Sequence, residues 1–274
     1  MKKIILSLIF SLILLPANAK VDKTSAEYLK NKKHFAIMNP IAENLVEKTL
    51  RKALTDNIGD YKYNVKFEMY SLSSLKKGIF KRAEASAHDL VIDNIPIKYL
   101  KVKTTEDYVW LDLKNKPVKF KSDCIFGYDI ELTEESINTA LQQENYKKKI
   151  TKVNNLAYPL FSMIDVKTVV KNNKLYFIIN YNLPLSSNSD KVRTFVVASD
   201  FKVENGKILV KDIKINKSYK NLSLHKIANL LNLLDPLTFT LAELNDNKCK
   251  TKIENVTIND NIVKINGKIF VKGE

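Results

Sequence analysis

Glycine is scarce in this sequence, and its scarcity argues against several kinds of site. Only six glycines occur among 274 residues. Loops that hold phosphate groups need several glycines close together, because the backbone itself must approach the anion. The sequence also has no Walker motif, no Gly-x-Ser-x-Gly and no His-Glu-x-x-His. Phosphate-loop nucleotide binding and the common hydrolase and zinc-protease chemistries are therefore not indicated.

Cysteine and histidine are equally rare, and neither forms a recognisable site. The three histidines, His34, His88 and His225, are scattered, and together with Cys124 and Cys249 they lack the spacing of metal ligands. Each cysteine falls in a strand pattern, where a cysteine most often serves as a small core residue rather than as a nucleophile. We predict no metal and no cofactor.

Two pairs of adjacent carboxylates, Glu106 with Asp107 and Glu134 with Glu135, lie at the ends of expected elements. Solvated acids are common at such positions, and residues next to each other in sequence point in different directions. We assign them no catalytic role. The sequence therefore gives no positive evidence of an enzyme.

Long hydrophobic runs are absent after the first twenty residues, and the run at the start is short. Two lysines precede an apolar stretch at residues 4–15, and residues 17–19 read Ala-Asn-Ala. This order is typical of a secretory signal peptide, here residues 1–19. An uncleaved membrane anchor is the alternative, but a span needs roughly 20 apolar residues. We expect export to a periplasm or cell envelope, or secretion, with residues 20–39 as a polar leader and residues 40–274 as a single domain.

Positive charge predominates, because 45 lysines and arginines face 30 aspartates and glutamates, a formal net charge of +15. Loss of the signal peptide with its two lysines would leave +13. Outside the cell membrane such a charge points to a phospholipid, an anionic membrane surface or an acidic polymer as partner. A general bias towards lysine on a merely solvated surface explains it equally well. We do not expect nucleic acid, because no basic helix or aromatic stacking motif appears.

The clearest helix is predicted from Pro40 to Ile58, where Gly59 ends it. Its apolar residues form one stripe, which we expect to pack on a sheet: Ile41, Leu45, Val46, Leu50, Ala53, Leu54 and Ile58. A short helix should open at Thr133, because Thr133 to Ser136 has the form of a capping box. A third helix is predicted over Leu222–Leu234.

The stretch from Leu72 to Thr105 shows the two-residue period of a strand with one covered face. Ala83, Ala85 and Ala87 point one way, and the phase then slips at Asp89 and again at Asn94. We predict either one long bent strand or a strand pair with bulges, because a slip of one residue turns the apolar set to the other face. The small alanines leave room above the sheet for a helix or a ligand.

Other segments have the same period, and turn residues join three pairs of them as hairpins. The predicted strands are 61–71, 108–113, 118–132 as one long strand, 166–170 with 175–183, 193–203 with 208–215, 237–241, and 252–258 with 262–271. Long antiparallel strands with a few helices predict an α+β protein.

Export to an oxidising compartment would permit a disulfide between Cys124 and Cys249, tying the middle of the chain to the last hairpin. Sequence alone does not show that their Cα atoms lie close enough. A disulfide and two separate core cysteines therefore both remain open.

Several segments in a fixed order carry a family resemblance. They are the helix at 41–58, LSSLKKG at 72–78, ASAHDLVIDNIPIKYL at 85–100, DIELTE at 129–134, LDPL at 234–237 and ING at 265–267. Together they resemble the LmeA-like phospholipid-binding family of exported bacterial envelope proteins, over about residues 40–271. The chain departs from the family in being rich in lysine and poor in glycine, and in a polar loop around residues 186–190.

The resemblance implies a curved antiparallel sheet packed along two or three amphipathic helices, similar to half of a tubular lipid-binding module. It implies an exported, non-enzymatic protein that binds or carries phospholipid in an apolar groove, where each buried acyl methylene contributes roughly 0.8 kcal/mol. The groove candidates are Ile79, Phe80, Ile92, Ile95, Ile97, Trp110 and Phe126. The head-group candidates are Lys76, Lys77, Lys81 and Arg82.

Two alternatives stay open. A basic structural or interaction protein of the envelope would have a closed core and would bind an acidic polymer or a partner protein with a steep salt dependence. An enzyme acting on a lipid or glycan would need a cleft with convergent acids, or a serine close to a histidine. No particular protein partner is indicated.

Overall fold

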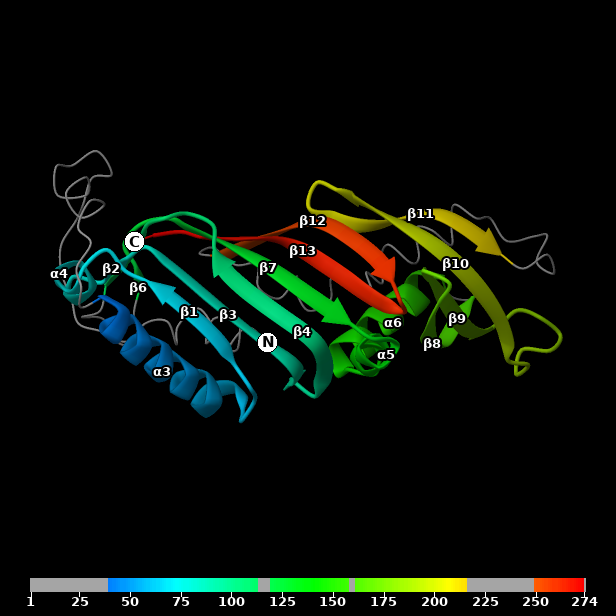
Figure 1. Cartoon of the computed structure of the whole chain (residues 1–274). Helices are drawn as coiled ribbons and strands as arrows, with labels where there is room; N and C mark the ends of the chain where they lie inside the picture. The colour runs from blue at the N-terminus through cyan, green and yellow to red at the C-terminus, as the bar shows by residue number, and fades with distance from the viewer. Residues whose placement is uncertain (1–38, 113–118, 158–160, 216–248, 274) are drawn as a thin grey trace.

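The protein is an elongated α+β molecule built on antiparallel strands (Figure 1). The computed structural model describes residues 39–112, 119–157, 161–215 and 249–273. Every strand pair within these ranges is antiparallel. The predicted α+β class with antiparallel strands is thereby confirmed.

The strands of the described ranges form three sheets. The large sheet has the order β1 (Asn64–Glu68), β3 (Arg82–Ile92), β4 (Ile95–Thr104), β7 (Cys124–Leu132), β13 (Ile262–Val271) and β12 (Cys249–Asn259). The second sheet has the order β11 (Lys207–Ile215), β10 (Arg193–Glu204), β9 (Lys174–Asn182) and β8 (Ser162–Lys171). The small sheet comprises β2 (Ile79–Phe80), β5 (Val109–Asp112) and β6 (Lys119–Phe120). The amide of Ile253 donates to the Gly206 carbonyl (3.1 Å), which joins the two larger sheets.

Four helices accompany the sheets in the described part of the chain: α3 (Asn39–Ile58), α4 (Leu72–Lys76), α5 (Glu134–Leu141) and α6 (Glu144–Ala157). Helix α3 lies along β1. Helix α4 lies near the first turn of α3, at the end of the large sheet where β2 begins (Figure 1). Helix α5 packs on β4 and β8, and α6 packs on β8, so both lie where the two larger sheets meet. One apolar core runs through both larger sheets.

The predicted strand pair at residues 82–104 is the β3–β4 hairpin. Asp93 and Asn94 form its turn with φ of 50° and 64°, the left-handed values that a two-residue hairpin of this kind requires. The predicted slip at Asp89 is confirmed. Asp89 has φ 52°, and the alternation of buried residues shifts by one position there, so that Leu90 follows Ala87 as the next buried residue. The slip predicted at Asn94 is this turn.

Helix α3 protects the exposed edge of the large sheet. The amide of Phe67 on β1 donates to the carboxylate of Glu47 (3.0 Å), and the amide of Met69, just after β1, donates to that of Glu43 (2.9 Å). Arg51 donates to the Val65 carbonyl at 3.3 Å. These side chains satisfy backbone groups that an edge strand otherwise leaves open to other chains.

Two residues of the predicted apolar stripe on this helix are not buried, which corrects the prediction. Ile41 is 69% exposed and Leu45 is 67% exposed. Because Glu43 and Glu47 turn towards β1, Ile41 and Leu45 point to the solvent side. The rest of the stripe is buried or half-buried.

Other predictions were partly wrong. The single strand expected at 118–132 is divided between β6 and β7, which belong to different sheets. The strand expected at 61–71 is shorter, and Ser71 caps a helix, α4, by accepting from the Ser74 amide (3.1 Å). The capping box at Thr133 and Ser136 is confirmed, and the following helix α6 was not predicted.

Several predicted segments lie outside the described residues. They are the signal peptide at 1–19, the polar leader except Asn39, the helix at 222–234 and the strand at 237–241. Asn39 itself opens helix α3. No helix of the described ranges combines the length and the apolar character that a bilayer span requires.

Candidate functional site

The large sheet divides between β3 and β4 at the end nearest α4. The two strands pair from the hairpin turn as far as Glu84 opposite Lys103. Beyond that point β3 continues to pair only with β1, up to Arg82, and β4 only with β7, up to Thr104. We call this opening the β3–β4 fork.

A polar hollow of about 530 Å³ opens at the fork. Its lining comes from β1, β3, β4 and the residue that follows β4: Lys66, Glu68, Arg82, Ala83, Glu84, Lys103, Thr104 and Thr105. Most of these side chains are charged or carry a hydroxyl. The hollow is therefore suited to a polar or charged group.

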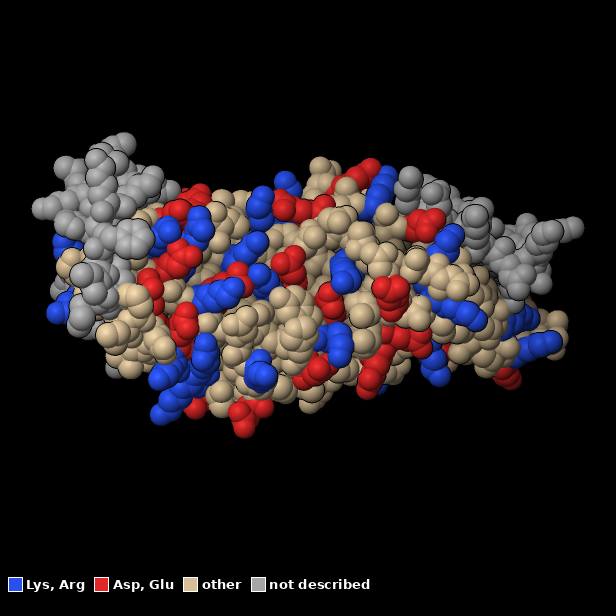
Figure 2. Space-filling model, viewed as in Figure 1, with Lys and Arg blue, Asp and Glu red and all other residues tan. Residues whose placement is uncertain are grey.

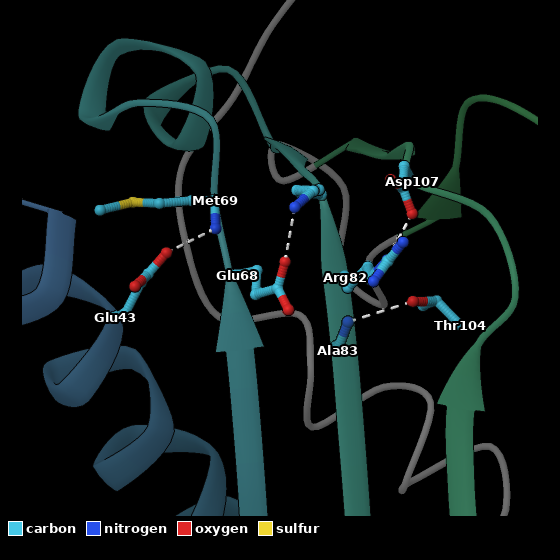
Figure 3. Close-up of polar contacts among 8 residues, drawn as sticks. Glu43, Glu68, Met69, Arg82, Ala83, Thr104 and Asp107 are labelled. Atoms are coloured by element: carbon cyan, nitrogen blue, oxygen red, sulfur yellow. Dashed lines mark hydrogen bonds and ion pairs between the residues drawn. The ribbon is translucent and has the colours of Figure 1, made fainter. Parts of the chain in front are cut away.

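Ion pairs surround the hollow and cross the fork (Figure 3). The Arg82 guanidinium donates to the carboxylate of Asp107 on the far side of the fork, and this bond raises the pKa of the guanidinium. Lys81 pairs with Glu68 at 2.8 Å. These contacts fix the rim of the hollow.

Two lysines of the lining remain available to a ligand. Lys66 and Lys103 lie on either side of Glu84 in one cross-strand row. Glu84 pairs instead with Lys101 at 3.0 Å, and that hydrogen bond raises the pKa of the Lys101 ammonium. Neither Lys66 nor Lys103 forms an ion pair with another residue that the structure describes. An anionic group in the hollow would meet both.

Small residues close the fork on the inner side of the sheet. Phe67 lies opposite Ala83 on one side of the fork, and Thr104 lies opposite Phe126 on the other. All four are buried. The Ala83 amide donates to the Thr104 hydroxyl oxygen at 3.1 Å. A single side-chain hydrogen bond therefore joins the two strands at the point where their ladder has ended.

The predicted groove residues are all buried, but they do not form one site. Phe80 and Phe126 lie beside the fork: the ring of Phe80 is 5.1 Å from that of Phe67, centroid to centroid, and Phe126 lies opposite Thr104. Ile92, Ile95 and Ile97 lie instead at the hairpin-turn end of β3 and β4. Ile79 and Trp110 belong to a separate apolar cluster, which also contains Tyr70 and Tyr108.

The predicted head-group residues divide in the same way. Arg82 lines the hollow and Lys81 borders it. Lys76 and Lys77 lie instead at the end of α4. Sequence reasoning missed Lys66, Lys103 and Thr104. The alternation of the strand predicted at 61–71 is compatible with Lys66 on the solvent side, but only the pairing of β1 with β3 brings it to the fork.

The structure does not support a disulfide between Cys124 and Cys249. Both cysteines are buried, and both lie opposite Val271, one on either neighbouring strand. Two strand spacings separate their Cα atoms by about 10 Å. A disulfide requires less than about 7 Å, so the large sheet itself keeps these cysteines apart.

On the face of the described residues that Figure 2 shows, the positive charge is not gathered into one patch. On the face of the large sheet seen in Figure 2, basic and acidic side chains alternate over the strands. Cross-strand pairs such as Lys264 with Glu131 (2.7 Å) and Lys268 with Glu254 (2.7 Å) account for part of this pattern. The hollow is thus a local feature of a mixed surface.

No family model, no curated protein and no solved structure matches this chain. The described ranges also contain no group of three or more histidine, cysteine or acidic side chains arranged to hold a metal ion. The fork and its hollow are therefore the basis on which we assign a function.

Proposed function

We propose that this is an exported, non-enzymatic protein that binds or carries phospholipid, with the head group in the hollow and the acyl chains in the apolar layer beneath the fork. The observation that carries the proposal is the fork itself. It has charged groups on its outer side and small residues, Ala83 and Thr104, between two phenylalanines on its inner side. An amphiphile needs this combination of a polar mouth and an apolar interior.

The overall form agrees with this proposal. The resemblance to the LmeA-like family implies a tubular lipid-binding fold, and such a fold would have a long antiparallel sheet with helices along it, as this protein has. We include that fold in the proposal.

The roles of the residues follow from their positions. Lys66 and Lys103 would donate to the phosphate, because no other described residue forms an ion pair with them. The Ala83–Thr104 hydrogen bond and the Arg82–Asp107 ion pair join the two sides of the fork, so an acyl chain enters when both open.

Acyl chains would supply most of the affinity. Each buried methylene contributes roughly 0.8 kcal/mol, whereas a lysine near an anionic lipid contributes about 1 kcal/mol. Binding of a two-chain lipid should therefore change little with salt, because screening weakens only the charge contribution.

The test is to count phospholipid on the protein after purification from its own host without detergent. Organic extracts would be measured by mass spectrometry for the unmodified protein and for a Lys66→Gln/Lys103→Gln variant. The matched control is Lys250→Gln/Lys252→Gln, which changes two exposed lysines on β12 of the same sheet.

We expect stoichiometric phospholipid in the unmodified protein and in the control. The hollow variant should bind phospholipid more weakly, by roughly fivefold for each lysine. Lipid-free protein that also takes up no phospholipid from vesicles would contradict the proposal.

The burial of every predicted groove residue favours a second candidate. In this candidate the apolar layer is simply a core, and the hollow binds an acidic polymer. Binding would then fall steeply with salt, because it would rest on charge alone. A titration with an acidic polysaccharide at low and high salt separates this function from phospholipid binding.

A further inference from the structure

The end of the molecule next to the hollow carries an apolar and basic surface that the phospholipid-binding proposal does not use. We propose that it docks the protein on an anionic membrane. The tip surface, as we call it, consists of six exposed residues: Ile41, Leu45, Lys48 and Lys52 on α3, and Leu72 and Lys76 on α4.

The four α3 residues form one stripe. Positions 41, 45, 48 and 52 repeat every three or four residues, so they lie on the same side of a helix with 3.6 residues per turn. The stripe extends over about 16 Å at 1.5 Å per residue. Its first half is apolar and its second half is basic, which suits a helix that enters a membrane interface at one end.

The acidic residues in the first three turns of α3 are directed away from this stripe. Glu43 and Glu47 accept from the backbone amides of Met69 and Phe67, as described above. Within α3, the one exposed acid near the stripe is Asp56, one turn beyond Lys52. The stripe therefore presents two lysines to anionic phosphates without a competing acid between them.

Helix α4 extends the same surface. Helix α3 runs antiparallel to β1, because Glu47 reaches Phe67 on the strand and the earlier Glu43 reaches Met69, just beyond its end. The start of α3, with Ile41, therefore lies beside the chain that leads from Met69 into α4 (Figure 1). Leu72 is 40% exposed, and Lys76 lies one helical turn after it.

An anionic bilayer fits this chemistry better than another protein does. Isolated leucine and isoleucine side chains flanked by lysines can insert between lipids while the ammonium groups reach the phosphates. The tip surface also lies at the fork end of the large sheet, since Glu68 of the hollow immediately precedes Met69. Docking would bring the mouth of the hollow close to the membrane.

The test is sedimentation with vesicles of phosphatidylcholine alone or mixed with phosphatidylglycerol. The protein is produced from the whole coding sequence, and its intact mass is determined first, because a retained apolar N-terminus would itself bind vesicles. The first variant is Ile41→Gln/Leu45→Gln, and the second is Lys48→Gln/Lys52→Gln. The matched control is Leu185→Gln/Val192→Gln, which changes two apolar residues with 69% and 57% exposure outside the tip surface.

We expect the unmodified protein and the control to bind the anionic vesicles and to bind phosphatidylcholine alone much more weakly. The lysine variant should lose roughly fivefold in affinity for each lysine at low salt. The apolar variant should lose at least tenfold. Equal binding by the apolar variant, the lysine variant and the control would overturn the inference.

This inference stands apart from the phospholipid cargo. If the tip surface docks the protein, its variants lose vesicle binding but keep the phospholipid that copurifies with them. If the hollow holds the cargo, the Lys66→Gln/Lys103→Gln variant loses phospholipid but still binds vesicles. Loss of vesicle binding only in the hollow variant would contradict the role of the tip surface.

Discussion

Thr104→Val tests the hydrogen bond that closes the fork. Valine has nearly the shape of threonine, but a methyl group replaces the hydroxyl oxygen that accepts from the Ala83 amide at 3.1 Å. Thr104 is 7% exposed and Ala83 is 3% exposed. The substitution therefore leaves a buried amide without this acceptor.

A buried donor left without an acceptor costs about 1–3 kcal/mol. In a protein of this size each kcal/mol lowers Tm by about 2–4 °C, so the expected loss is about 2–12 °C. Thr104→Ser is the matched control, because it keeps the oxygen and removes only a methyl group, at a cost of about 0.8 kcal/mol.

Thermal unfolding followed by circular dichroism measures the loss of stability. Hydrogen exchange at the Ala83 amide identifies its cause, because this amide should exchange faster in Thr104→Val and at an unchanged rate in Thr104→Ser. If the fork admits lipid, Thr104→Val should also release phospholipid faster. A variant with unchanged Tm and an equally protected Ala83 amide would refute this reasoning.

Three further predictions follow from the sheets and the cysteines. Gly267→Ala should destabilise the protein by roughly 1–3 kcal/mol, because the new Cβ would overlap the Lys252 carbonyl oxygen and lie 2.6 Å from the Tyr128 hydroxyl. Gly127→Ala, whose Cβ would meet its nearest neighbour at 3.5 Å, should stay within about 0.5 kcal/mol; equal urea midpoints for the two variants would show this reasoning to be wrong. The hydrogen bond from Lys98 lowers the pKa of Asp89 in the folded protein. The ion pair therefore contributes its full stability above the unfolded pKa of about 3.9, and this contribution is lost as the pH falls through the lower pKa of the folded state. Asp89→Asn should therefore lose less stability than the unmodified protein in acid unfolding experiments, and identical losses would count against the ion pair. Both cysteines should react with iodoacetamide in denaturant without prior reduction. If neither reacted until a reductant was added, the two cysteines would be joined in a disulfide after all.

Local patterns allowed the prediction of much of the large sheet. The alternation of Ala83, Ala85 and Ala87 gave the covered face of β3, and the slip at Asp89 gave the change of face. Asparagine and aspartate at the turns gave the hairpins, because these residues adopt left-handed backbone angles at little cost.

Where local patterns were read too broadly, the prediction was wrong. Phe120 shares the phase of Cys124 and Phe126, and only the tertiary structure assigns it to another sheet. In α6 the spacing of Tyr146, Ile150 and Val153 is helical, and these residues pack in or against the core. That signal was present in the sequence, although the surrounding lysines obscured it.

The fork was beyond sequence analysis because it depends on pairing between distant strands. Lys66 and Lys103 approach one another only because β1 and β4 both pair with β3, through Glu84. The segment after β4 in turn brings Asp107 to Arg82 beyond the end of the β3–β4 ladder. No local pattern encodes either arrangement.

Mass spectrometry of organic extracts from the detergent-free protein, compared with a mock purification, tests the central claim most directly. We expect about one phospholipid for each protein chain in the unmodified protein, and less in the Lys66→Gln/Lys103→Gln variant. Extracts without phospholipid, from a protein that also acquires none from vesicles, would contradict the account and leave the hollow as a site for acidic polymers.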